Sequence, residues 1–227
     1  MQLIALSLAP VVLLFWFFYV RDKYEKEPPG LLIRLFAFGA FSVLPAIAFG
    51  LLLGRFTNFY LVPGSLKYLL VENYLVIGLV EEMVKLYVVV SVAYGHAAFN
   101  EPYDGIIYAI TAALGFAAVE NIMYVYQGGV GVGVARMLLA VPAHALFGSF
   151  MGHYLSRSKF SSGGRSTRLI YLALLIPAFL HGTYNSLLST GRIELAAIVV
   201  PLSLFMWRTA LKQGARASSQ SPFRPES

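Results

Sequence analysis

Long apolar stretches recur along the whole chain and constrain its fold more than any other feature. A helix that crosses the hydrocarbon core of a bilayer needs about 20 mostly apolar residues. Stretches that reach or approach this length lie near residues 2–20, 31–53, 66–95, 103–126, 131–155, 168–189 and 193–211. Only 12% of the 227 residues are charged, against about 25% in soluble domains. The sequence therefore predicts an all-α, multispan transmembrane bundle of about seven helices.

Basic residues gather in alternate loops, and this asymmetry predicts an orientation. An N-terminus outside places the loops 21–30, 96–102 and 156–167 in the cytoplasm, together with the C-terminus. Eleven Lys and Arg residues then lie inside, namely Arg21, Lys23, Lys26, Arg157, Lys159, Arg165, Arg168, Arg208, Lys212, Arg216 and Arg224. Four lie outside, namely Arg55, Lys67, Arg136 and Arg192. This distribution follows the positive-inside rule, so the net charge of +6 indicates membrane topology and no nucleic-acid partner.

The domain organisation is predicted to be simple. Residues 1–212 form one transmembrane domain, and residues 213–227, rich in Ser, Arg and Pro, form a disordered cytoplasmic tail. The first stretch has neither a basic segment before it nor a small-residue cleavage site after it, so we expect a span rather than a signal peptide. The first and last stretches are the weakest, which leaves five or six spans as alternatives. The absence of cysteine excludes disulfides, a thiol nucleophile and thiolate metal ligands.

Six ionisable or imidazole side chains lie deep within the apolar stretches. They are Glu81, Glu82 and Lys85 in the third stretch, Glu120 in the fourth, His144 in the fifth and His181 in the sixth. An unpaired Asp, Lys or Arg at the centre of a membrane helix costs about 2.5–3.5 kcal/mol, so these groups are expected to meet one another. Lys85 lies three and four residues after the two glutamates and can reach either carboxylate. We predict one hydrated pocket near the middle of the bilayer or slightly outward of it.

Simpler structural explanations exist for several of these residues. A buried Glu–Lys pair can fix helix packing, and a single membrane histidine is more often a hydrogen-bonded packing residue. Pro142 and Pro177 precede the two histidines, however, and a proline frees backbone carbonyls where a cavity can open. Gly148 and Gly152 form a surface of small residues that predicts close contact with a neighbouring helix.

The residue types favour hydrolysis of a peptide bond. Attack by water on an amide needs a base, a donor to the oxyanion and an acid for the leaving amine, and carboxylates with imidazoles supply these functions. The chain lacks the residues that other intramembrane proteases use, since it has no His-Glu-x-x-His, Gly-x-Ser-x-Gly or cysteine. Aspartyl catalysis needs two embedded aspartates, but Asp22 and Asp104 lie at the ends of apolar stretches.

Four short strings resemble, in order, the motifs of the PrsW family of membrane proteases. They are Glu81-Glu82-Met-Val-Lys85, Phe116-Ala-Ala-Val-Glu120-Asn121, His144-Ala-Leu-Phe-Gly148 and His181-Gly-Thr-Tyr-Asn185. The segments Asp22–Pro28 and Tyr103-Asp104-Gly105 resemble the family as well. The resemblance implies a multi-pass protease of the bacterial plasma membrane. Its substrate would be a single-span regulator such as an anti-sigma factor, which receives its first (site-1) cut near the extracytoplasmic side.

We expect the acidic residues to carry the chemistry. Either Glu81 or Glu82 activates the water, and Lys85 holds the other carboxylate. The two glutamates should titrate as a coupled pair. Glu120 shares the role of base or receives a proton.

The remaining candidates assist at the carbonyl. His144 and His181 polarise it, and Asn121 donates to the developing oxyanion. No cofactor is required by this scheme. A variant remains open in which Glu120, His144 and His181 hold a divalent zinc ion and a water, because two imidazoles and one carboxylate make a catalytic zinc site.

Three other functions use similar residues. A proton- or ion-coupled transporter also needs ionisable groups at the midplane, but the chain shows no duplicated halves of the kind common in transporters. The related CAAX prenyl endopeptidases resemble this pattern but have a histidine where this chain has Glu120, which disfavours a prenylated substrate. A noncatalytic scaffold is disfavoured because every expected motif residue is present.

Overall fold

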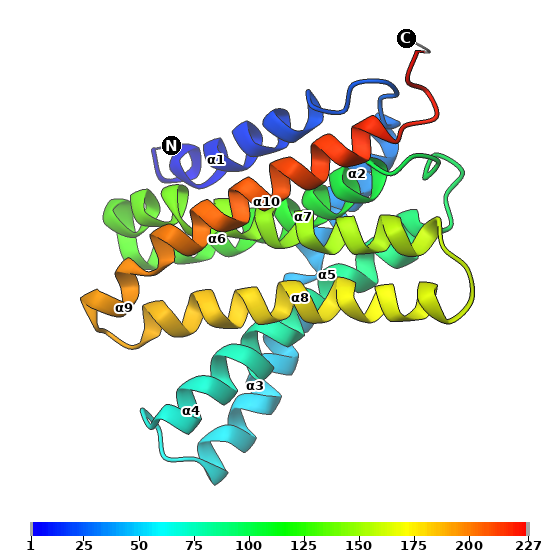
Figure 1. The fold of residues 1–227 in the computed structure, drawn as a ribbon. Helices are drawn as coiled ribbons and strands as arrows, with labels where there is room; N and C mark the ends of the chain where they lie inside the picture. Colours follow the sequence, from blue (N-terminus) through cyan, green and yellow to red (C-terminus); the bar gives the residue numbers. More distant parts are fainter. Residues whose placement is uncertain (1, 226–227) are drawn as a thin grey trace.

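The computed structural model describes residues 2–225, and all regular secondary structure in this range is helical. The elements are α1 (Gln2–Tyr19), α2 (Pro29–Phe41), α3 (Val43–Tyr60), α4 (Leu66–Val71), the π-helical η1 (Glu72–Leu79), α5 (Val80–Val89), the π-helical η2 (Val90–Tyr94), α6 (Asp104–Leu138), α7 (Ala140–Lys159), α8 (Gly163–Ser189), α9 (Ile193–Ala197) and α10 (Val199–Ser219). Figure 1 shows them packed as one bundle with the described ends of the chain at opposite ends. The predicted all-α membrane bundle is confirmed.

Within residues 2–225, five helical ranges are long and apolar enough to cross a membrane: Gln2–Tyr19, Pro29–Tyr60, Asp104–Lys159, Gly163–Ser189 and Ile193–Ser219. The third comprises 56 residues, which would extend about 84 Å as a straight helix, far beyond a hydrocarbon core of about 30 Å. The chain folds back within it at Gly129, whose φ of 72° is a left-handed conformation that suits glycine. The count of seven spans and the orientation stay predictions.

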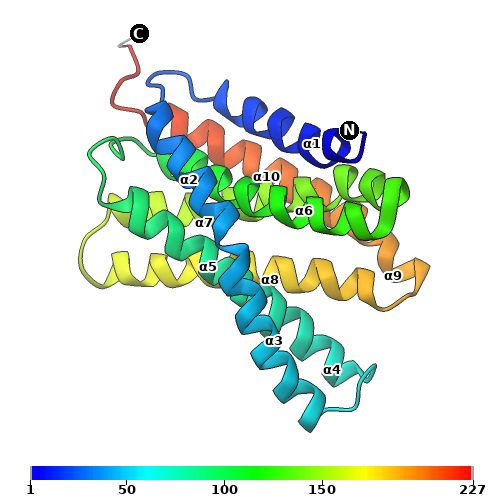
Figure 2. The same cartoon turned by 180° about the vertical axis from the view of Figure 1, so that it is seen from behind.

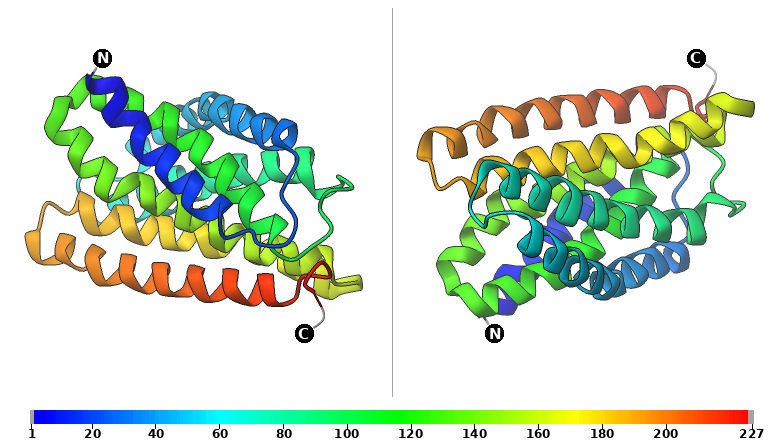
Figure 3. Two further views of the ribbon diagram at one scale, coloured as in Figure 1. Left: turned by 90° about the horizontal axis from the view of Figure 1, so that it is seen from above. Right: turned by 90° about the horizontal axis from the view of Figure 1, so that it is seen from below.

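Helix α6 forms the centre of the bundle. It packs against α1, α2 and α7, and every residue from Tyr103 to Ala118 is buried. A helix that is buried on all sides belongs in the interior of a bundle. The hairpin of α3 and α4 projects from the bundle (Figure 2), and α10 returns alongside α8 after the short α9 (Figure 3).

Two predicted spans are interrupted where a proline follows. The predicted span 31–53 breaks at Ser42, between α2 and α3, and the predicted span 131–155 breaks at Leu139, whose φ is −119°. Pro45 and Pro142 lie four residues after Phe41 and Leu138, the last residues of the preceding helices. A proline ring clashes with the carbonyl four residues earlier, which favours a break at these two positions, although α8 continues through Pro177.

The boundary predicted for the disordered tail is wrong. Helix α10 continues to Ser219, beyond the predicted end of the domain at residue 212. The hydroxyl of Ser221 then donates a hydrogen bond to the carboxylate of Glu101, and both side chains are buried. The loop before α6 therefore anchors a segment whose composition alone suggests disorder.

Helices α6 and α7 approach each other closely through glycines, as predicted. A Cβ atom built on Gly152 would lie 2.1 Å from the carbonyl oxygen of Gly105, and one on Gly148 would lie 2.9 Å from that of Ala109. This contact fixes the depth of His144, which lies one turn before Gly148 on α7.

Replacing Gly152 by alanine is therefore expected to lower the free energy of unfolding by about 1–3 kcal/mol, because the added methyl group meets backbone that has no room to move. Gly50 is the matched control, since nothing lies within 4 Å of its Cβ position. Gly50→Ala should be neutral or stabilising because alanine is the better helix former. Unfolding of both variants in detergent micelles tests this, and equal stabilities would contradict it.

Candidate active site

The ammonium of Lys85 lies at the centre of a cluster drawn from α5 and α7. Its Nζ atom is 2.8 Å from Oε1 of Glu82, 3.3 Å from Oε2 of Glu81 and 3.1 Å from Nδ1 of His144. Lys85 and Glu82 have no exposed side-chain surface. The predicted pairing of Lys85 with both glutamates is thus present, and the same ammonium also contacts a histidine from another helix.

The two histidines connect this centre to α6 and α8. His181 on α8 places Nδ1 3.0 Å from Oε1 of Glu82 and Nε2 4.0 Å from Oε2 of Glu81. His144 on α7 places Nε2 2.8 Å from Oε2 of Glu120. Their rings meet edge to face with centroids 5.3 Å apart. All six groups singled out from the sequence therefore meet in one place.

Glycines on η1 and α8 allow His181 to reach the glutamates. A Cβ atom on Gly182 would lie 2.4 Å from Cδ1 of Tyr74, and one on Gly78 would lie 3.1 Å from the backbone nitrogen of Gly182. The wider turns of η1, which ends at Leu79, two residues before Glu81, form one surface of this contact. Single π-helical insertions are frequent at functional sites.

Two adjoining cavities separate the accessible groups from the buried ones. Glu81 and Glu120 line both a cavity of about 450 Å³ and one of about 250 Å³, and His144 and His181 line the larger. The side chains of Glu81 and Glu120 are 14% and 17% exposed. Glu82 lines neither cavity. Glu81 is therefore the member of the glutamate pair that can meet a substrate or water.

Arg136 is a site residue that the sequence interpretation missed by counting it among the residues outside the membrane. Its guanidinium donates to Oε2 of Glu120 and to Oδ1 of Asn121, both at 2.9 Å. Asn121 precedes it by fifteen residues, which is about 22 Å in a straight helix, so only the reversal at Gly129 brings the two together. The sequence feature that could have identified it is an arginine surrounded by apolar residues.

The amide of Asn121 lies away from the cavity. Its Nδ2 donates to the carbonyl of Ser7 on α1 at 2.8 Å, its Oδ1 accepts from Arg136, and the side chain is buried. Asn121 lines neither cavity of the site, so it is poorly placed for the oxyanion role proposed from the sequence. Tyr184 lines the larger cavity, and its buried hydroxyl has no hydrogen-bond partner among residues 2–225.

The acidic residues of the remaining motif segments lie outside this site. Asp22, Glu27 and Asp104 are buried between the α1–α2 loop and the start of α6. Burial raises the pKa of Asp22 to about 7 and that of Glu27 to about 9. Asp104 accepts the backbone N–H groups of Asn100 and Glu101 at 2.7 Å each. This cluster links two loops and lines neither cavity of the site.

The donor set that suits a metal ion is Glu81, His144 and His181. One ligand atom of each lies within 4.8 Å of the others, and two imidazoles with one carboxylate match catalytic zinc sites. The set predicted from the sequence contained Glu120 in place of Glu81. Glu120 instead contacts Nε2 of His144 and is held by Arg136. This is the position of an outer carboxylate that orients a metal-binding histidine.

The charges of the site also fit a cation. Three carboxylates, Glu81, Glu82 and Glu120, face the positive charges of Lys85 and Arg136. With neutral imidazoles, the ionised carboxylates outnumber the cations by one. A divalent ion would reverse this excess, so the residues present fit such an ion both in donor type and in charge.

Comparison with known proteins decides the family. A family model described as "PrsW family intramembrane metalloprotease" matches residues 27–210. The chain belongs to this family. It is 40% identical over 188 residues to Protease PrsW of Geobacillus kaustophilus, covering 82% of this chain and 80% of the relative. It is 33% identical over 217 residues to Protease PrsW of Bacillus subtilis, covering 96% of each, and no solved structure matches.

Family membership settles the general activity. The chain is a multi-pass bacterial membrane protein and a peptidase that hydrolyses peptide bonds of membrane-protein substrates. A more distant relative, Protease PrsW of Clostridioides difficile, is 31% identical over 216 residues and aligns over 93% of this chain and 89% of its own length. The resemblance inferred from the motifs is confirmed, and the transporter alternative finds no support.

Proposed function

We propose that this protein makes the first cut in a single-span membrane regulator of the anti-sigma factor type, within the bilayer or at its edge. One observation carries the proposal. Glu81, His144 and His181 converge on a cavity of about 450 Å³, with Glu120 beside them. Cleavage inside a membrane requires a water-accessible space that contains the hydrolytic groups and has room for a peptide.

In the proposed mechanism, Glu81, His144 and His181 would hold a divalent metal ion such as zinc. A zinc ion at this position would supply Lewis acidity and a hydroxide nucleophile at neutral pH. His181 is oriented for this role because its Nδ1 is hydrogen-bonded to Glu82, which leaves Nε2 directed toward Glu81. Glu120 orients His144 in the same way through Nε2, and Nδ1 of His144, which lies 3.1 Å from Nζ of Lys85, would exchange the ammonium for the ion.

Glu120 is our candidate for proton transfer. Its two hydrogen bonds, to His144 and Arg136, both use Oε2, and Oε1 accepts none from residues 2–225. Glu120 accepts a proton from the attacking water as the C–O bond forms. It returns this proton to the nitrogen as the C–N bond breaks, so that the amine leaves neutral.

Two donors beside the cavity can stabilise the oxyanion. The hydroxyl of Tyr184 has no partner within the described chain, and Arg136 presents a guanidinium at the cavity wall. Donors aimed at the developing negative charge contribute more in a site of low dielectric than in water. Tyr184 and Arg136 are therefore our candidates for the oxyanion role first assigned to Asn121.

The other polar residues of the cavity suit an unwound peptide. A substrate helix must expose its backbone N–H and C=O groups before it is cut, and such groups need hydrogen-bond partners in a membrane. Asn73, Asn185 and Ser189 line the same cavity. Nδ2 of Asn73 is already 2.8 Å from Oγ of Ser189, so a peptide would exchange partners with these side chains.

Metal removal gives a direct test. We expect the protein purified into lipid nanodiscs to carry about one zinc ion per chain and to cut a single-span anti-sigma factor substrate. A strong chelator should abolish cleavage, and added zinc should restore it, because the nucleophile depends on the ion. Elemental analysis and gel-based cleavage assays measure both effects.

The same assay separates the two forms of the mechanism. Full activity after complete removal of metal would reject the metal-dependent form and leave hydrolysis by the glutamates alone. A multi-span control substrate with the same cleavage segment should resist cutting. Equal cleavage of both substrates would contradict the proposed preference for single-span proteins.

A further inference from the structure

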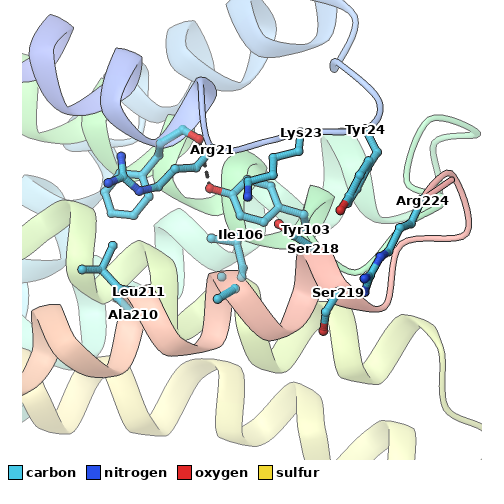
Figure 4. Close-up of a pocket in the computed structure, with 13 residues that line it drawn as sticks. Arg21, Lys23, Tyr24, Tyr103, Ile106, Ala210, Leu211, Ser218, Ser219 and Arg224 are labelled. Atoms are coloured by element: carbon cyan, nitrogen blue, oxygen red, sulfur yellow. Dashed lines mark hydrogen bonds between the residues drawn. The ribbon is translucent and has the colours of Figure 1, made fainter. Parts of the chain in front are cut away.

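A separate cavity of about 390 Å³ lies between the end of α1, the start of α6 and the last turns of α10 (Figure 4). It shares no lining residue with the cavities of the hydrolytic site. Helix α1 ends at Tyr19, so this cavity lies where the chain leaves a predicted span. Groups at this depth meet lipid headgroups.

The lining of this pocket carries positive charge only. Arg21, Lys23 and Arg224 line it, and none of its lining residues is acidic. The guanidinium of Arg21 lies 3.5 Å from the ring centroid of Phe17 and donates to the Phe17 carbonyl at 3.0 Å. Lys23 and Arg224 form no ion pair within residues 2–225. The pocket therefore offers cationic donors that form no direct ion pair with an acidic side chain of the described chain.

Two of the three cationic residues lie at one end of the pocket and the apolar side chains at the other. Lys23, Tyr24 and Arg224 lie toward one end in Figure 4, whereas Ala210 and Leu211 lie toward the other, together with Arg21, whose guanidinium stacks on Phe17. The hydroxyl of Ser218 adds a further polar group to the lining, whereas that of Ser219 already donates to the carbonyl of Arg216 at 2.8 Å. An amphipathic ligand with an anionic head would fit both ends of the pocket. A small hydrophilic anion would occupy only the cationic end.

Small residues on α10 create the space. Ala210, Gly214 and Ser218 follow one another at intervals of four residues and face the pocket. A Cβ atom on Gly214 would lie 3.4 Å from a ring atom of Tyr103. Tyr103 is buried, and its hydroxyl donates to the carbonyl of Phe18 at 2.9 Å. The wall opposite α10 is therefore fixed, and the hollow persists.

The segment after α10 is held in place as well. The hydroxyl of Ser221 donates to buried Glu101, and the same oxygen accepts the backbone N–H of Phe223 at 3.1 Å. The N–H of Arg224 bonds the carbonyl of Ser221 at 3.3 Å. These contacts hold Arg224 in the lining of the pocket rather than on a free tail.

We propose that this pocket binds the phosphodiester headgroup of an anionic phospholipid, with an acyl chain along Ala210 and Leu211. Basic pockets between transmembrane helices at headgroup depth bind anionic lipids, and arginine pairs with phosphate through directed hydrogen bonds. Lys23 and Arg224 hold the phosphate. The lipid thus joins α1, α6 and α10, and its binding does not depend on the hydrolytic site.

The test compares phosphatidylglycerol with phosphatidylcholine in nanodiscs and in detergent. Phosphatidylglycerol should raise the thermal unfolding temperature, and native mass spectrometry should show it retained on the wild type. Lys23→Gln/Arg224→Gln should weaken this retention about thirtyfold. The control Lys212→Gln/Arg208→Gln removes the same charge from exposed positions of α10 outside the pocket and should retain the lipid.

Two further arms identify the source of the phosphate and the use of the cavity. Inorganic phosphate in phosphatidylcholine nanodiscs should give no comparable stabilisation. Ala215→Trp fills the pocket without a change in charge and should also lose retention. The proposal is overturned by equal loss in the control pair, by stabilisation with free phosphate alone, or by undiminished retention in the Lys23/Arg224 variant.

Discussion

Glu81→Gln is expected to abolish both metal retention and peptide cleavage, whereas Glu120→Gln should abolish cleavage and leave the metal bound. The difference follows from geometry. Glu81 belongs to the donor set with the two histidines, and Glu120 lies behind His144 and contacts its Nε2. A neutral amide at position 81 is a much weaker ligand than a carboxylate. At position 120 the loss of a proton acceptor should slow cleavage by about 10²–10⁴-fold.

Purified variants in nanodiscs, assayed for zinc content and for cleavage of a single-span substrate, measure the two effects separately. Glu194→Gln is the matched control because Glu194 is exposed on α9 and should behave as wild type. Full activity of Glu120→Gln would contradict its role in proton transfer. Full zinc content in Glu81→Gln would contradict the donor set.

The convergence of the site was predictable because lipid penalises isolated charge. Glu82 and Lys85 are buried completely, and their spacing on one helix already required them to pair. The same penalty demanded partners for Glu120 and His144 on other helices, and they are 2.8 Å apart. Spacing and solvent physics together therefore identified which side chains would meet.

The division of roles within the cluster was not predictable. Adjacent helical residues point about 100° apart, so one of Glu81 and Glu82 had to face away from the cavity. Which one does so depends on how α8 packs through Gly182 against Tyr74. Likewise, the choice between Glu81 and Glu120 as a metal ligand depends on which side of the His144 ring each carboxylate occupies.

Contacts made across chain reversals were harder to predict than the reversals themselves. The separate apolar stretches 103–126 and 131–155 already predicted a turn between them, and Gly129 adopts a positive φ there. The sequence did not indicate that this turn brings Arg136 to Glu120. The end of α10 gives a second case. Its composition indicates a disordered tail, but Ser221 finds a partner in Glu101, a residue 120 positions earlier in the sequence.

Lys85→Met is expected to destabilise the folded protein by about 3–5 kcal/mol. Nζ of Lys85 contacts both glutamates of α5 and lies 4.2 Å from the ring centroid of Phe116. Methionine can fill the volume beside the ring but supplies no charge. Glu82, which has no exposed surface, would keep a buried negative charge with only His181 as a partner. Unfolding in mixed micelles measures the loss, and Lys67→Met, at an exposed position, is the control.

The double variant Lys85→Met/Glu82→Gln tests the cause of this loss. If the destabilisation comes from an uncompensated charge, neutralising Glu82 as well should recover at least half of it, because a buried pair can often be replaced by neutral groups at little cost. A single variant as stable as wild type, or a double variant no better than the single, would contradict this explanation. Activity should not recover, because a neutral amide at position 82 is a weaker partner for Nδ1 of His181 than the carboxylate. Recovery of stability without cleavage would separate the structural role of the pair from its role in orienting the histidine.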